Sequence, residues 1–180
     1  MNSLTLSEYQ LLALRTAPPF KTKMIEPIQG FLLHGVLGLS TEIAEIVEDS
    51  SNLENVLQEI GDVMWYCNLI CSGLGVDLFN LGSYEVNPQS LLTDLVSYMG
   101  TACDCIKRHL YYSVPLDEDR LIQSIAKIQS IMKSLSGGRL EECLFMNIEK
   151  LKVRYPEKFD AEKANARNLD AEKKIFNQHK

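Results

Sequence analysis

The sequence predicts an all-α protein, and three observations carry this prediction. Apolar residues recur at intervals of three and four along most of the chain, which is the spacing of one face of an α-helix. Proline and glycine residues stand at the ends of these stretches, where helices commonly stop. No segment of useful length alternates apolar and polar residues as a half-buried strand does. We therefore expect a bundle of helices.

Three helices are expected in the N-terminal half. The first starts at a Ser or Thr cap and ends near residue 15, ahead of two prolines. The second covers residues 28–49 and is interrupted by Gly35 and Gly38, which would allow close helix packing or the approach of a ligand. The third covers residues 53–74 and ends at a pair of glycines.

Three more helices are expected in the C-terminal half, over residues 89–110, 117–135 and 140–154. The segment 82–88 contains Gly and Pro and is the clearest internal boundary of the chain. The tail from residue 160 to 180 is rich in charge and alanine, which is typical of a solvated helix or a frayed extension.

Composition narrows the class of protein. A chain of 180 residues with 46% hydrophobic content can form one domain or two small repeats that share a core. The net charge of −6 argues against a nucleic-acid polymer as partner, because such binding needs clustered Lys and Arg. Five cysteines without a C-x-x-C pair favour a reducing compartment. No signal peptide and no uninterrupted apolar run of about 18 residues is present. We expect a cytoplasmic protein that does not bind membranes.

Four acidic residues form two pairs, E-x-x-E at Glu42 and Glu45 and E-x-x-D at Glu59 and Asp62. Residues three apart project from one face of a helix, so a helical hairpin can bring the two pairs together. Such carboxylates repel one another unless a divalent cation neutralises them. A solvated helix face also commonly carries E-x-x-E, but apolar residues flank both pairs here. We therefore expect all four acids to bind a metal and to take part in catalysis.

The ligand types indicate which metal. Zinc and copper sites usually include His or Cys, and no histidine stands at the E-x-x-H spacing of a di-iron bundle. An all-oxygen set suits Mg²⁺, with Mn²⁺ as a substitute. Because Mg²⁺ in proteins commonly binds a few carboxylates together with substrate phosphates, a phosphate substrate is expected. A spare carboxylate would act as general base.

The chain also contains a degenerate internal repeat, in which the apolar positions of the two halves correspond. This alignment pairs the four acids, Glu42, Glu45, Glu59 and Asp62, with Thr101, Asp104, Ser124 and Lys127, in that order. The second half thus keeps one carboxylate and gains a cation, although similar helical hairpins can also align by chance. The interpretation divides the chain into an acid-bearing half (1–82), a degenerate half (83–160) and a charged tail (161–180).

Two stretches resemble the MazG-like all-α nucleoside triphosphate pyrophosphohydrolases. Residues 34–45 and 59–66 carry the two acid pairs, and residues 147–156 resemble the closing N-x-x-K-L-x-x-R-Y-P signature of that family. The chain departs from the family in the short segment between its acid pairs. A segment like the missing connection occurs at residues 107–117, which suggests a tandem fusion.

The resemblance implies an activity and a set of residues. The expected reaction is Mg²⁺-dependent hydrolysis of a nucleoside triphosphate, and we expect a deoxynucleotide, to the monophosphate and pyrophosphate. Lys150 and Arg154 would contact phosphates and Asn147 would contact the substrate, although both cations also fit a solvated helix end. Members of that family generally form dimers or tetramers, so the resemblance implies a homo-oligomer, and we expect a dimer.

Two further residues are candidates for substrate binding on their own account. Trp65 could stack on a base or belong to the core. His34 lies two turns before Glu42 and could reach the ligand, or could serve in the core or as a cap. The alternative function is that of a catalytically inactive helical protein that binds a nucleotide or a regulatory partner, as the loss of acids in the second half would suggest.

Overall fold

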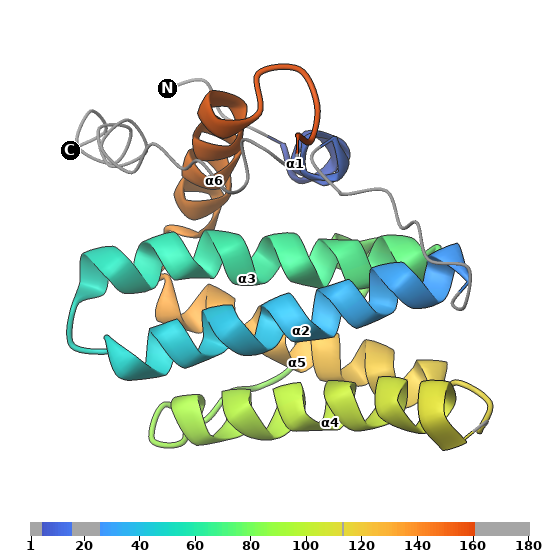
Figure 1. Cartoon of the computed structure of the whole chain (residues 1–180). Helices are drawn as coiled ribbons and strands as arrows, with labels where there is room; N and C mark the ends of the chain where they lie inside the picture. The colour runs from blue at the N-terminus through green and yellow to red at the C-terminus, as the bar shows by residue number, and fades with distance from the viewer. Residues whose placement is uncertain (1–4, 16–25, 113, 161–180) are drawn as a thin grey trace.

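The computed structural model describes residues 5–15, 26–112 and 114–160, and every regular element within these ranges is helical. The all-α prediction is therefore confirmed (Figure 1). The predicted tail at 161–180 lies outside the described residues. The elements are α1 (Leu6–Leu14), α2 (Pro27–Glu48), α3 (Leu53–Leu74), the 3₁₀ turn η1 (Leu78–Asn80), α4 (Leu91–Tyr112), α5 (Glu118–Leu135) and α6 (Leu140–Arg154).

Local sequence signals set the helix ends. The Thr5 hydroxyl accepts a hydrogen bond from the Glu8 backbone N–H at 3.2 Å, and the Glu8 carboxylate accepts one from the Thr5 N–H at 2.9 Å. This reciprocal capping box starts α1 at the residue after Thr5. At the C-terminal end of α3, Gly75 closes the helix with a φ of 70°, a left-handed conformation that favours glycine.

Helices α2 and α3 form a closely packed hairpin because α2 carries glycines on the side that faces α3. A Cβ atom at Gly35 would lie 2.4 Å from Ile70 Cγ1, and one at Gly38 would lie 2.1 Å from the ring of Tyr66. A larger residue at either position would force the facing side chain or helix α3 to shift. The prediction that these glycines allow close helix packing is confirmed.

Helix α3 is the centre of the bundle and contacts α1, α2, α5 and α6 (Figure 1). Its buried residues lie on several sides, which is the pattern of a core helix. Close approach of α6 depends on Gly61, where a Cβ atom would lie 2.8 Å from Asn147 Cβ. Helices α4 and α5 form a second hairpin that packs on α2 and α3, and the buried core runs without a break from α1 to α6.

Among the described residues, one helix has the length and hydropathy of a membrane span. Pro27–Glu48 has a mean hydropathy of 1.4 in its most apolar window, although no uninterrupted apolar run marks it in the sequence. Of that window, 44% is buried inside the structure. Core helices of soluble proteins and N-terminal signal sequences pass the same criterion, so the helix does not decide the location of the protein.

Candidate metal centre

The hairpin of α2 and α3 brings three carboxylates together. Glu42 and Glu45 come from α2 and Glu59 from α3, and one oxygen atom of each lies within 4.8 Å of the others. Glu42 and Glu59 are half-buried, whereas Glu45 is exposed. We call these three residues the acidic cluster. The E-x-x-E spacing places the first two on one face of α2, and the glycine-mediated approach of α3 supplies the third.

The cluster is chemically suited to a small hard cation. Oxygen ligands of Mg²⁺ in octahedral geometry lie about 3 to 4 Å apart, since each is about 2.1 Å from the ion. Three carboxylate oxygens within 4.8 Å need only a small closure to reach that geometry. Exposed Glu45 leaves the cluster open to solvent, which would supply the remaining water ligands.

Proximity and burial change the protonation of the cluster. Burial, and then the charge of Asp62, raise the pKa of Glu59 to about 8, and the nearby Lys150 ammonium offsets part of this effect. Burial, followed by the Asp62 charge, also raises the pKa of Glu42, which shares a side-chain hydrogen bond with Glu59. At neutral pH the two carboxyl groups are therefore expected to share a proton.

The fourth predicted ligand, Asp62, is engaged by α6 instead. Its Oδ1 accepts a hydrogen bond from Asn147 Nδ2 at 2.6 Å, and its Oδ2 forms an ion pair with Lys150 Nζ. Asp62 still lies close enough to raise the pKa of Glu42 and Glu59. The structure thus brings the four predicted acids to one region but joins only three of them into the cluster.

Two of the three predicted contacts on α6 are buried beside this site. Asn147 is 1% exposed and Lys150 is 7% exposed. The amide oxygen of Asn147 has no hydrogen-bond partner among the described residues. A buried polar atom without a partner is costly, so this oxygen has acceptor capacity that the described residues do not use.

His34 packs in an aromatic group with Trp65 and Tyr66. The His34 ring centroid lies 6.0 Å from that of Trp65 and 5.6 Å from that of Tyr66, both in edge-to-face geometry. The buried Trp65 indole N–H donates to the Ala13 carbonyl at 2.9 Å, which ties the ring to α1. Trp65 therefore has a clear packing role, and its contact with a base stays a prediction. Burial lowers the pKa of His34, which favours the neutral ring.

Arg154 ends α6 near the same aromatic group. Its guanidinium carbon lies 6.0 Å from the centroid of the Tyr155 ring. It also lies within electrostatic reach of Tyr66, whose pKa is raised to about 12 by burial and by the charges of Glu42 and Asp62, an effect that Arg154 partly offsets. Arg154 thus adds a positive charge on the Tyr66 side of the acids.

Tyr9 is a residue of this region that the sequence reasoning missed. Its buried hydroxyl donates to the Gly61 carbonyl at 3.4 Å, and burial and the Asp62 charge raise its pKa. Gly61 directly precedes Asp62, so α1 supports the turn of α3 that carries the acid. No local signal connects residues so far apart in sequence, and the contact follows only from the packing of α1 on α3.

Comparisons with protein-family models, with curated proteins and with solved structures find no match. Any assignment of function therefore depends on the residues of this chain.

Proposed function

We propose that this protein is a Mg²⁺-dependent hydrolase of the MazG-like type, which converts a nucleoside triphosphate, expected to be a deoxynucleotide, to the monophosphate and pyrophosphate. The observation that carries the proposal is the meeting of Glu42, Glu45 and Glu59 from two helices within 4.8 Å. The resemblance of the acid pairs and of residues 147–156 to that family adds the expected reaction.

In the proposed reaction a water oxygen bonds to the α-phosphorus and the bond to the α–β bridging oxygen breaks, which releases pyrophosphate. The acidic cluster, with Asp62 beside it, would hold Mg²⁺ or Mn²⁺. When bound, the ion would polarise phosphate oxygens and lower the pKa of a water molecule. A carboxylate oxygen of the cluster that does not contact the ion would accept the proton of the water. Glu59, which loses its proton when the ion binds, is the proposed general base through the oxygen that does not contact the ion.

Helix α6 and the aromatic group would position the substrate. Lys150 is beside Asp62, and Arg154 is within electrostatic reach of Tyr66, as Glu42 and Asp62 are. Both cations could therefore contact the phosphates of a triphosphate that is bound through the metal ion. Asn147 offers its unused amide oxygen in the same place. His34 and Trp65 are the proposed contacts of the base, since a heteroaromatic ring can stack on an aromatic side chain.

A panel of ribonucleoside and deoxynucleoside triphosphates tests this proposal. The full chain is incubated with each nucleotide and Mg²⁺, and pyrophosphate is measured. Release with at least one nucleotide, and its loss in EDTA, is the expected result. If no nucleotide yields pyrophosphate, including dUTP and dCTP, the hydrolase proposal is wrong.

A second candidate is a catalytically inactive protein that binds a nucleotide or a regulatory partner. The observation in its favour is that the fourth acid, Asp62, is held by Asn147 and Lys150 rather than joined to the cluster. Calorimetry that shows nucleotide binding without any turnover would favour this candidate, and measurable turnover would exclude it as a full account. Homodimer formation and a cytoplasmic location stay predictions, the first of which sedimentation would test.

A further inference from the structure

Lys150 is an unusual lysine because its charged group is buried. Its side chain is 9% exposed, and its ammonium pairs with Asp62 Oδ2. Lysine is almost never fully buried unless it is paired, since removing its charge from water is costly. The same ammonium partly offsets the raised pKa of Glu59, so its charge acts on the acidic cluster as well as on Asp62.

Each oxygen of Asp62 has a partner on α6. Asn147 donates to Oδ1 and Lys150 pairs with Oδ2. A divalent ion that binds Asp62 through Oδ2 would compete with the Lys150 ammonium for that oxygen. The two cations would also repel each other at short range. Binding of one to Asp62 therefore weakens binding of the other.

We propose that Lys150 is an internal counter-cation of the metal centre, which a divalent ion displaces from Asp62. This inference rests on the metal-binding part of the proposed function. In the protein without metal, Lys150 balances the charge of Asp62 and favours the ionised form of Glu59. When the ion binds the acidic cluster, Asp62 joins it as a fourth ligand and the Lys150 ammonium moves away.

The geometry of the chain supports this exchange. Asp62 stands three residues after Glu59 on α3, so both carboxylates project from one face of the helix. The flexible four-carbon stem of Lys150 allows its ammonium to move without displacement of α6. Asn147 can keep its hydrogen bond to Oδ1 while Oδ2 changes partner. The displaced ammonium would then be available to an anionic group of the ligand, such as a phosphate.

A double-mutant cycle on metal affinity tests the proposal without nucleotide. Binding of Mn²⁺ to the full chain is measured from the spin-resonance signal of the free ion, for wild type, Lys150→Met, Asp62→Asn and the double variant. Lys150→Met is expected to bind Mn²⁺ about tenfold more tightly or better, because Asp62 no longer has a competing cation. In the Asp62→Asn background the same substitution should change the affinity by less than about twofold.

The matched control is Lys152→Met, on the same helix. Lys152 is 45% exposed and pairs with Glu149 across one turn, so this variant removes the same charge at a distance from the cluster. Its Mn²⁺ affinity should equal that of wild type. Circular dichroism verifies that each variant is folded. If Lys150→Met does not fold, Lys150→Gln replaces it, because an amide can still donate to Asp62, and tighter Mn²⁺ binding is again expected.

Two results would overturn the inference. One is unchanged or weaker Mn²⁺ binding by the folded Lys150 variant, and the other is an equal gain in the Asp62→Asn background, which would mean that Lys150 acts only through its long-range field. Glu45→Gln separates these outcomes from failure of the metal site itself. If wild type binds Mn²⁺ and Glu45→Gln does not, the metal site stands whatever Lys150 does. If neither wild type nor the Lys150 variant binds Mn²⁺, both proposals are wrong.

Discussion

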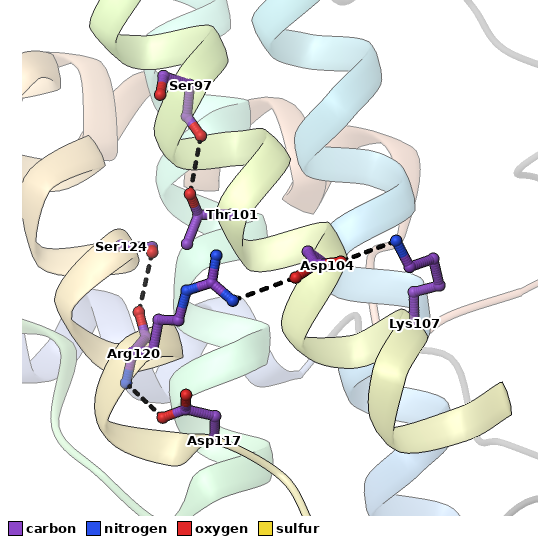
Figure 2. Close-up of polar contacts among 7 residues, drawn as sticks. All are labelled: Ser97, Thr101, Asp104, Lys107, Asp117, Arg120 and Ser124. Carbon is purple, nitrogen blue, oxygen red and sulfur yellow. Dashed lines mark hydrogen bonds and ion pairs between the residues drawn. The ribbon is translucent and has the colours of Figure 1, made fainter. Parts of the chain in front are cut away.

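In the hairpin of α2 and α3, three carboxylates lie together and none forms an ion pair with a described residue. In the hairpin of α4 and α5, the one aligned carboxylate, Asp104, is paired with Lys107 at 2.7 Å and with Arg120 at 3.1 Å (Figure 2). In the described part of the chain, the first hairpin leaves the acidic cluster without an ion pair, whereas the second pairs its aligned carboxylate with its own side chains.

The other aligned positions of the second hairpin are also satisfied internally. The Thr101 hydroxyl donates to the Ser97 carbonyl at 3.1 Å, and the Ser124 hydroxyl donates to the Arg120 carbonyl at 2.9 Å (Figure 2). Lys127, aligned with Asp62, places its ammonium 4.8 Å from the centroid of the Tyr98 ring. Similar apolar patterns thus occur in two helical hairpins, and among the described residues only the first groups three carboxylates that could hold a metal ion.

The largest expected effect comes from removal of one carboxylate of the acidic cluster. Glu59→Gln should lower pyrophosphate release by at least about a hundredfold, since it removes a metal ligand or the general base. It should also weaken Mn²⁺ binding measured without nucleotide. Glu48→Gln, at an exposed position of α2 outside the cluster, is the control and should keep wild-type activity. Full turnover by the Glu59 variant would remove this residue from the site.

The raised pKa of Glu59 predicts that metal affinity depends on pH. Below a pH of about 8 the ion must displace the proton that Glu59 holds, so Mn²⁺ affinity should rise with pH, by up to about tenfold per unit, and level off above pH 8. Titrations of Mn²⁺ binding between pH 6 and 9 measure this slope. A flat profile would show that no carboxyl of the cluster holds a proton in that range.

The same pKa gives a prediction for stability in EDTA. A carboxyl whose pKa is raised on folding contributes stability that is complete below its unfolded value, near 4.5, and is lost as the pH rises through about 8. The free energy of unfolding of wild type, relative to that of Glu59→Gln, should therefore decrease as the pH rises from about 4.5 to about 8. Urea unfolding at pH 6 and pH 9 measures the difference, and a wild type that gains stability over the variant at pH 9 would contradict it.

A smaller effect is expected from the glycines that set helix spacing. Gly38→Ala should lower the free energy of unfolding by about 1 to 3 kcal/mol, because its Cβ would meet the Tyr66 ring. It should also weaken Mn²⁺ binding, since the shift falls one helical turn before Glu42, in the hairpin that carries the acidic cluster. Gly100→Ala in α4 is the matched control: its Cβ meets nothing within 4 Å, so the change should be neutral or stabilise by up to about 1 kcal/mol. Equal effects of the two substitutions on urea unfolding would contradict the close contact at Gly38.

The smallest effect is expected at Asp104. Its ion pairs are exposed, and such pairs contribute little. Asp104→Asn should leave Mn²⁺ affinity and turnover unchanged and should alter urea unfolding only slightly, with the difference shrinking at high salt. A marked loss of metal binding in this variant would show that the second hairpin takes part in the metal site.

The sequence by itself determined the helices. The bounds of α3 and α6 match the predicted ranges, and α2 and α5 begin and end within a residue of theirs, because caps, glycines and apolar periodicity act within a few residues of one another. For α4 the predicted range is two residues too early at both ends. The spacing of the acid pairs also indicated one helix face for each, which follows from helix geometry alone.

Only the tertiary structure decided which side chains the acids contact. Because α6 packs closely on α3 at Gly61, Asp62 accepts a hydrogen bond from Asn147 and forms an ion pair with Lys150. The other three acids remain together as the acidic cluster. Because α1 packs on α3, the Trp65 indole N–H donates a hydrogen bond to the Ala13 carbonyl. These contacts join residues more than fifty positions apart, and no local pattern encodes them. They depend on which side chains meet when whole helices pack, because charge and hydrogen-bond partners are chosen by distance in space rather than along the chain.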